Sequence, residues 1–417
     1  MKASILTIGD EILNGSTVDT NSAYIAKESA ANGIAIAGIF SIPDSYSGIY
    51  EGLEIAGKNA EIVFITGGLG PTKDDITKQA LANFFKTELC FNASVFEKIE
   101  SYFKKRGNKQ VELNRKLAMI PSSSKLIPND KGTAMGMKFV HHDKIYISMP
   151  GVPNEMRYML SNYVLPQIVS EKNLPTILNK YIMCAGIGES AIYEKIEDIE
   201  ASLPPGTTLA YLPNLGNVKL RLTTMVNEDS ADAASNLSTI QSKISQRIAR
   251  HVYSFNENES LAKCVGDLLL KNKMTLSTAE SCTGGYISHL ITAIPGSSAY
   301  FEGAITAYSY DIKERLLGVN KETLHTFGAV SEETIQEMAS GLLRRMCTDY
   351  GIAVSGIAGP GGGTPDKPVG TVWIAVSNKD RVKAKCFSLT NQREYNIKIS
   401  AQIALNMLRN FILENES

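Results

Sequence analysis

The chain has 417 residues, which is too long for one ordinary hydrophobic core, so we expect two or three domains. Its 42 Lys and Arg nearly balance its 43 Asp and Glu, which argues against nucleic acid or an anionic membrane held by bulk charge. Six scattered cysteines without a CxxC pair argue against a disulfide scaffold or structural zinc, and no apolar run reaches membrane-spanning length. Without a signal-peptide cleavage region near its start, the sequence predicts a soluble cytoplasmic protein.

Apolar strands alternate with helices in the first third of the chain. Residues 3–8, 34–42 and 61–66 are predicted strands, and helical spacing covers residues 21–32 and 76–85. Because each strand is almost wholly apolar, we predict an α/β domain with a parallel sheet covered by helices on both faces. Ligands bind such sheets at the carboxyl ends of the strands.

Two polar strings follow these strands, GDEILNGSTVDTN (residues 9–21) and TGGLGPTKDDITKQAL (residues 66–81). The glycines of the second can expose backbone N–H groups to a phosphate. Asp10 and Glu11 end one strand, and Asp74 and Asp75 follow the glycines after another. Carboxylates repel phosphate unless a cation lies between them, so the pattern predicts a divalent metal such as Mg²⁺, with Asp10 and Asp75 as its ligands. The alternative is that Asp74 and Asp75 only cap the helix that starts there, after a turn made by the glycines.

Two isolated features near the domain cores have ordinary structural explanations. His141 and His142 precede Asp143 and Lys144 between two strands, which predicts a hairpin turn at the surface rather than a metal site. The single tryptophan, Trp373, lies in an apolar strand and is predicted to pack in a core.

The middle of the chain has a different pattern of apolar and polar residues. The pattern is loose over residues 165–180, and a small α+β unit follows. Its predicted strands are residues 181–186, 209–213 and 218–226, and its predicted helices are residues 189–202 and 230–249. The polar string NENE at residues 256–259 is the predicted linker to the last domain.

A serine follows a predicted strand (residues 274–279) and precedes a predicted helix (residues 285–293) in the string AESCTGG. The hydroxyl of Ser281 should point to solvent beside the amides of the helix start, near Thr283 and Gly284, which can stabilise an oxyanion. No histidine is placed to take its proton, but Lys313 with a depressed pKa can do so, relayed through Tyr308. The pattern predicts an amide-cleaving serine enzyme, and the alternative is a plain helix cap and turn.

The last third of the chain resembles the C-terminal domain of the CinA (competence/damage-inducible) family, the nicotinamide mononucleotide deamidases. The resemblance covers about residues 257–410 and rests on ESCTGG, PGSSAYFEGAITAYSYDIKERLLGV, GAVSEETIQEMA and SGIAGPGGGTPDKPVGTVWIAV. It implies Ser281 as nucleophile with Tyr308 and Lys313 as partners and no metal, whereas Tyr310 replaces the usual asparagine. The residues expected to bind substrate there are Glu280, Thr283, Gly284, Gly285, Ser297, Ser298, Gly359 and Arg393.

The first domain resembles the molybdopterin-binding (MoaB/MogA-like) domain of CinA over about residues 2–165, through GDEIL, TGGLGPTKDD, GTAMGM and MPGVPNEM. Met135 replaces the usual proline of the third motif. The resemblance implies ADP-ribose pyrophosphatase activity that needs a divalent metal. The residues expected to bind this ligand are Asp10, Glu11, Asn21, Gly67, Gly68, Gly70, Thr72, Asp75 and Glu155.

The middle unit resembles the KH-like module of CinA, but its Gly186-Ile187-Gly188-Glu189 loop is not basic, and Glu189 would repel phosphate. We therefore expect a spacer and dimerisation module rather than an RNA-binding one.

Together these observations predict a cytoplasmic, homodimeric, bifunctional enzyme of NAD salvage. Its fold is α/β, with a three-layer parallel-sheet domain (residues 1–168), a small α+β KH-like module (178–254) and an α/β deamidase domain (257–415). Its expected ligands are nicotinamide mononucleotide and ADP-ribose, with no nucleic acid and no membrane. Two alternatives stay open: a first domain that binds a pterin or nucleotide without chemistry, and a chain that is wholly a regulatory binding protein.

Overall fold

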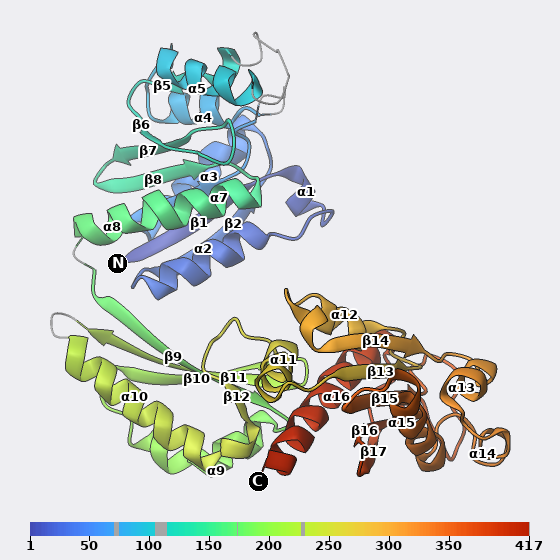
Figure 1. Cartoon of the computed structure of the whole chain (residues 1–417). Coiled ribbons are helices and arrows are strands. Elements are labelled where there is room, and N and C mark those ends of the chain that lie inside the picture. Colours follow the sequence, from blue (N-terminus) through green and yellow to red (C-terminus); the bar gives the residue numbers. More distant parts are fainter. Residues whose placement is uncertain (71–74, 105–114, 173, 227–229, 417) are drawn as a thin grey trace. The chain divides into compact units, whose positions relative to one another are not determined.

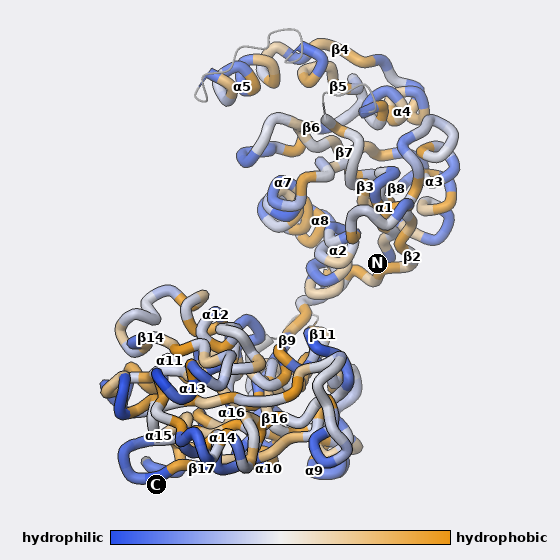
Figure 2. Tube along the Cα trace, turned by 90° about the vertical axis from the view of Figure 1, so that its right-hand side faces the viewer, coloured by the Kyte–Doolittle hydropathy of each residue, from blue (hydrophilic) through white to orange (hydrophobic). Residues whose placement is uncertain are grey.

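The computed structural model describes residues 1–70, 75–104, 115–172, 174–226 and 230–416 (Figure 1). The chain forms two compact units, one made of residues 1–178 and 224–233, the other of residues 179–223 and 234–417. Figure 2 shows hydrophilic residues interspersed with hydrophobic ones along the helices. None of the described helices combines the length and apolar character that crossing a membrane requires.

The first unit is built on a six-stranded sheet. Four of its strands, β2, β1, β3 and β8, run parallel to one another, as predicted, and the other two, β7 and β6, pair antiparallel at one edge. The predicted hairpin turn joins β7 to β8, and its two residues His142 and Asp143 both have positive φ, as a two-residue hairpin loop requires. The strands in spatial order are β2 (Ala35–Ile42), β1 (Lys2–Ile8), β3 (Ile62–Thr66), β8 (Lys144–Met149), β7 (Gly136–His141) and β6 (Lys125–Ile127).

Helices cover both faces of this sheet because the buried strands are apolar on both sides. In β1, Ala3 and Ile5 join one core while Leu6 and Ile8 join the other. The first core is closed by α2 (Thr20–Ala31), α7 (Pro153–Met159), η1 (Leu160–Val164) and α8 (Leu165–Lys172), and the second by α3 (Tyr46–Lys58) and α4 (Thr77–Phe84). The remaining elements are α1 (Asp10–Leu13), β4 (Leu89–Phe91), α5 (Ala93–Lys104) and β5 (Met119–Pro121). The three-layer prediction is confirmed.

The second unit begins with the small α+β module. Within the loosely patterned segment, residues 165–172 form α8 of the first unit, and residues 176–180 form the first half of β9. The module's sheet has the order β10 (Thr207–Asn214), β11 (Asn217–Val226), β9 (Thr176–Ala185) and β12 (Val252–Ser254), and its helices are α9 (Glu189–Ala201), α10 (Ser230–Arg247) and η2 (Ala249–His251).

A five-stranded sheet forms the last part of the second unit. Its strands β14, β13 and β15 are parallel, and β16 and β17 continue it antiparallel. The order is β14 (Phe301–Thr306), β13 (Leu276–Glu280), β15 (Tyr350–Gly356), β16 (Thr371–Asn378) and β17 (Val382–Ser388). One core contains α11 (Leu261–Asn272), α12 (Tyr286–Thr292) and α16 (Arg393–Glu416), and the other contains α13 (Tyr310–Leu317), α14 (Lys321–Phe327) and α15 (Glu332–Met346). Trp373 packs against the second of these cores, as predicted.

The module and this last sheet belong to one compact unit, and residues 256–259, the predicted linker, connect them. These residues form an ordered turn between β12 and α11, in which the Glu259 amide donates to the Asn256 carbonyl. On α16, the side chain of Arg409 is only 5% exposed and donates to the backbone carbonyls of Arg250 and Val252 in the module. A buried guanidinium bonded to the module fixes the two parts together.

Candidate functional site

Ser281 follows the carboxyl end of β13, where its backbone amide donates to the Val354 carbonyl of the neighbouring strand at 2.9 Å. The residue is only 8% exposed and lines a small pocket, whereas the sequence predicted a hydroxyl that points into open solvent. This cavity has a volume of about 170 Å³. It is lined by Ser281, Cys282, Tyr308, Lys313, Ala329, Val330, Ser355, Gly356, Ala358 and Arg393.

Lys313 lies on α13, is 1% exposed, and contacts the serine directly. Its Nζ lies 2.9 Å from Ser281 Oγ and donates to the Ala307 carbonyl at 2.6 Å. Within the described ranges, no carboxylate forms an ion pair with Lys313. Burial lowers the pKa of Lys313 to about 8, because the charged form loses hydration that nothing fully replaces. Roughly one tenth of the molecules then carry a neutral amine at pH 7, whose lone pair can accept the hydroxyl proton.

Tyr308 does not lie between these two groups, so the predicted relay is wrong. Its side chain is 62% exposed, and its hydroxyl accepts a hydrogen bond from Arg393 Nη2 at 3.1 Å. Arg393 Nη1 donates in turn to the Gly359 carbonyl at 2.9 Å. Tyr308 and Gly359 therefore orient the guanidinium on the cavity wall, while Lys313 reaches the serine without an intermediary.

The direct contact predicts a mild phenotype for Tyr308→Phe. Because the substitution removes a partner of Arg393 and leaves the Lys313–Ser281 contact intact, we expect KM for the substrate to rise and kcat to fall by no more than about tenfold. Steady-state kinetics on the purified variant measure both constants. A loss of kcat as large as that of a Lys313 variant would instead support proton transfer through Tyr308.

Glu280 is completely buried, and its carboxylate accepts from the backbone N–H groups of Gly285, Ile287 and Ser288. It caps α12 and is not available to substrate, contrary to the prediction. Because they bind Glu280, these amides at the start of α12 are not available to stabilise an oxyanion. The Gly284 amide, also predicted for that role, donates to the Ser281 carbonyl. In the part of the chain that the structure describes, the amides of Cys282 and Thr283 donate to no oxygen, and the Cys282 amide lies near its own thiol. Only Cys282 lines the cavity.

Ser297 and Ser298, the predicted phosphate ligands, lie away from this cavity. They belong to η3 (Ser297–Ala299), which precedes the amino end of β14. Because β14 runs parallel to β13, they lie at the opposite edge of the sheet from Ser281. Apart from Lys313, Arg393 is the only cation among the described lining residues, so it is the group that can meet an anion there.

Cys282 is a second potential nucleophile beside Ser281. Burial raises the pKa of its thiol to about 12, so the thiol stays protonated at neutral pH. Lys313 Nζ contacts Ser281 Oγ and forms no described hydrogen bond with the thiol, so Ser281 is the better placed nucleophile.

The sequence did not single out the loop of Ala329 and Val330, which lines the cavity. Ser355 is buried and donates to the Ala329 carbonyl at 2.7 Å, and the Ala329 amide donates to the Tyr310 hydroxyl at 3.2 Å. Tyr310, the residue that departs from the family pattern, therefore holds a wall of the cavity. The string GAVSEE was the only signal for this loop.

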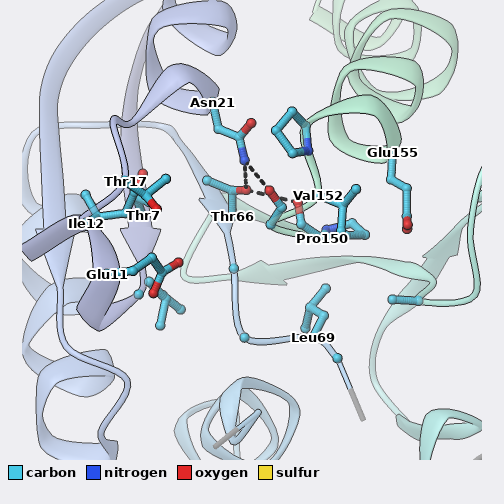
Figure 3. A pocket seen from close by; sticks show the side chains of 18 of the residues that line it. Thr7, Glu11, Ile12, Thr17, Asn21, Thr66, Leu69, Pro150, Val152 and Glu155 are labelled. Carbon is cyan, nitrogen blue, oxygen red and sulfur yellow. Dashed lines mark hydrogen bonds between the residues drawn. The ribbon is translucent and has the colours of Figure 1, made fainter. Parts of the chain in front are cut away.

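A larger cavity of about 480 Å³ lies at the carboxyl ends of β1 and β3 in the first unit (Figure 3). These strands are parallel neighbours, which brings the two predicted loops together. Gly67 has φ +116°, and a Cβ there would lie 2.1 Å from the Ile8 carbonyl oxygen, so only glycine fits. The predicted residues that line the cavity are Glu11, Asn21, Gly67, Gly68, Gly70, Asp75 and Glu155.

Asn21 is one of the buried polar residues that line this cavity. Its Nδ2 donates to Thr66 Oγ1 at 3.1 Å and to the Gly151 carbonyl at 2.8 Å, as Figure 3 shows. Its Oδ1 is buried and accepts from no described donor, so it can accept from a ligand. Glu155 is oriented by a 2.6 Å bond from Asn129, which the sequence analysis missed together with Thr66.

The cavity does not contain the predicted pair of metal ligands. Asp10 is exposed and is not one of the lining residues, and Thr72 lies outside the described residues. Asp75 Oδ1 accepts from the Gly70 amide at 2.7 Å, and no group of three His, Cys, Asp or Glu among the described residues could hold a metal ion. The described residues thus do not fit a resident metal. The acidic lining residues are Glu11, Asp19, Asp44, Asp75 and Glu155.

Comparisons with known proteins cover the whole chain. Residues 4–170 match the probable molybdopterin binding domain family, residues 179–254 the KH domain of damage-inducible protein CinA, and residues 258–412 the CinA C-terminal domain. A CinA-like protein from Cytophaga hutchinsonii is 43% identical over 99% of this chain and 98% of its own length. One from Flavobacterium psychrophilum is 39% identical over the full length of both. A solved competence/damage inducible protein from Agrobacterium tumefaciens is 40% identical over 36% of this chain and 92% of its own, with a TM-score of 0.35.

Proposed function

Because the chain belongs to the CinA family, as its full-length relatives show, we propose that its C-terminal cavity hydrolyses the carboxamide of nicotinamide mononucleotide to nicotinate mononucleotide and ammonia. The observation that carries this proposal is the buried Lys313 amine, 2.9 Å from Ser281 Oγ with a pKa near 8. A lysine with so low a pKa beside a serine hydroxyl is the base that a serine amidase without histidine needs.

In the first half of the reaction, Ser281 Oγ attacks the amide carbon while Lys313 takes the hydroxyl proton. The amide oxygen gains negative charge, for which the backbone amide of Cys282, which donates to no described oxygen, is a donor at the cavity wall. Lys313 then gives its proton to the departing nitrogen, the C–N bond breaks, ammonia leaves, and the nicotinoyl group remains as an ester on Ser281.

In the second half, water attacks the ester carbon as Lys313 takes one of its protons. The C–O bond to Ser281 breaks, the serine recovers a proton from Lys313, and nicotinate mononucleotide leaves. Arg393 is the cation on the wall that can meet the substrate phosphate, held for that purpose by Tyr308 and Gly359.

A substrate panel tests this assignment. Ammonia release is compared for nicotinamide mononucleotide, nicotinamide riboside and nicotinamide. We expect the mononucleotide to have the highest kcat/KM, since only it carries a phosphate for Arg393. Equal rates for all three, or release from none of them, would contradict the assigned substrate.

For the first unit we propose binding and cleavage of a nucleotide diphosphate sugar such as ADP-ribose, which enters with its own divalent cation. The supporting observation is the charge of the cavity: five carboxylates and, among its described lining residues, no Lys, Arg or His. A bare diphosphate would be repelled there, whereas its magnesium complex would not. A pterin ligand bound without chemistry is the alternative for the same cavity.

We therefore expect ADP-ribose to bind the full chain only when Mg²⁺ is present. Titration calorimetry should show a dissociation constant at least about tenfold larger in EDTA than in Mg²⁺. In Mg²⁺, Glu11→Gln should weaken the binding of ADP-ribose, whereas the control Glu51→Gln, at an exposed position, should not. Ammonia release should be unchanged by EDTA. Equal binding with and without Mg²⁺ would contradict the proposed form of the ligand.

A further inference from the structure

A third cavity, of about 490 Å³, lies inside the second unit, between the small module and the last domain. It shares no lining residue with the cavity at Ser281. Its walls come from loops of the module and from β17 and α16. The lining residues are Gly186, Gly216, Arg250, His251, Lys383, Ala384, Lys385, Phe387, Gln402, Ile403, Asn406, Met407 and Asn410.

The described lining of this cavity is basic, with Arg250, Lys383 and Lys385 and no carboxylate. Just outside it, the carboxylate of Glu414 forms ion pairs with Arg250 at 3.2 Å, Lys383 at 2.9 Å and Arg381 at 3.6 Å. Three cations on one carboxylate leave a positive excess. Lys385 adds to it, because it lies over the Phe387 ring and no described acid pairs with it. An anion would be attracted to this wall.

The lining also has a part made of apolar and neutral polar groups, which begins beside Lys385. Phe387, Ile403 and Met407 are partly buried and supply apolar surface. Asn406 Oδ1 is buried and accepts from no described donor, so it can still accept a hydrogen bond. A ligand suited to both parts has an anionic end and a flat polar ring, which describes a nucleotide.

The approach of the module to α16 depends on two glycines. Gly186 has φ +69°, and a Cβ there would lie 2.4 Å from Asn406 Nδ2; Gly216 has φ +74°, and a Cβ there would lie 2.8 Å from Ile399 Cδ1. Gly186 belongs to the loop Gly186-Ile187-Gly188-Glu189, in which a KH fold would hold a nucleotide backbone. Here Gly186 instead lies against α16 and helps to form the third cavity.

We propose that this third cavity is a mononucleotide site, with the phosphate at Lys383, Lys385 and Arg250 and the ring against Phe387. The ligand bridges the module and α16, the helix whose first residue, Arg393, lines the cavity at Ser281. A nucleotide there would hold the module against the helix that carries the substrate-facing arginine.

Lysine footprinting on the full chain tests the site. The protein is acetylated with and without AMP, and the labelling of each lysine is measured by mass spectrometry. We expect AMP to slow the labelling of Lys385 at least about threefold, inorganic phosphate to do so less, and adenosine not at all. Lys271, an exposed lysine of α11 outside the cavity, should label equally in all samples.

A matched pair of variants completes the test. In calorimetry, Lys385→Glu should weaken AMP binding at this site at least about tenfold, whereas Lys271→Glu, with the same change of charge, should leave it within about twofold. Absence of protection by AMP, equal protection of Lys271, or protection by adenosine as strong as that by AMP would each overturn the proposal. So would unchanged AMP binding in a folded Lys385→Glu variant.

Discussion

Lys313→Arg is expected to lower ammonia release from nicotinamide mononucleotide by about 10² to 10⁴-fold, as much as Lys313→Ala does. Arginine keeps the positive charge but cannot be deprotonated near neutral pH, so it cannot take the proton of Ser281. Initial rates at fixed substrate, with circular dichroism and thermal melting of each variant, measure the effect and check the fold.

The control for this comparison is Lys321→Arg, at the exposed start of α14, which should retain full activity. If Lys313 served only to attract the substrate by charge, the arginine variant would keep most of the rate and the alanine variant would not. That difference would contradict the role of Lys313 as the base.

Ser281→Ala is expected to abolish ammonia release, a loss of at least about 10³-fold, because it removes the atom that forms the ester. The variant should remain folded, since the strand bond from position 281 to the Val354 carbonyl is made by the backbone. Coupled ammonia detection over long incubations sets the lower limit of the rate.

Ser298→Ala is the matched control, because Ser298 is exposed at the opposite edge of the sheet. It should leave the rate unchanged. A Ser281→Ala protein that kept near-normal turnover would refute the serine mechanism, and a dead Ser298→Ala protein would show that the cavity is completed by residues beyond those lining it in one chain.

Local patterns were sufficient to predict the strands that carry both sites. The apolar runs of β1, β3 and β13 are long and end in glycine-rich or polar strings, so both the sheet and the position of the ligand edge follow from the sequence. Lys313 was predicted to act on Ser281 through Tyr308, whereas its Nζ contacts Ser281 Oγ directly.

The errors concern the direction of side chains and the pairing of distant elements. Glu280 and Ser281 are adjacent, yet the Glu280 carboxylate caps α12 and Ser281 lines the cavity. Successive residues along an extended strand project to opposite sides, which separates these two neighbours at the end of β13. Ser297 and Ser298 are close to Ser281 in sequence, but a parallel neighbour strand starts at the far edge. Polar composition predicted the linker at residues 256–259, but not the bonds that Arg409, about 150 residues later, makes to the module just before it.

The pH dependence of kcat/KM for ammonia release from nicotinamide mononucleotide, measured from pH 6 to 10, tests the central claim most directly. Burial lowers the pKa of Lys313 to about 8, and the neutral amine is the active form. The rate constant should therefore rise about tenfold per pH unit below pH 8 and level off above it. A constant that is independent of pH, that falls as pH rises through 8, or that is zero throughout would contradict a buried lysine acting as the base for Ser281.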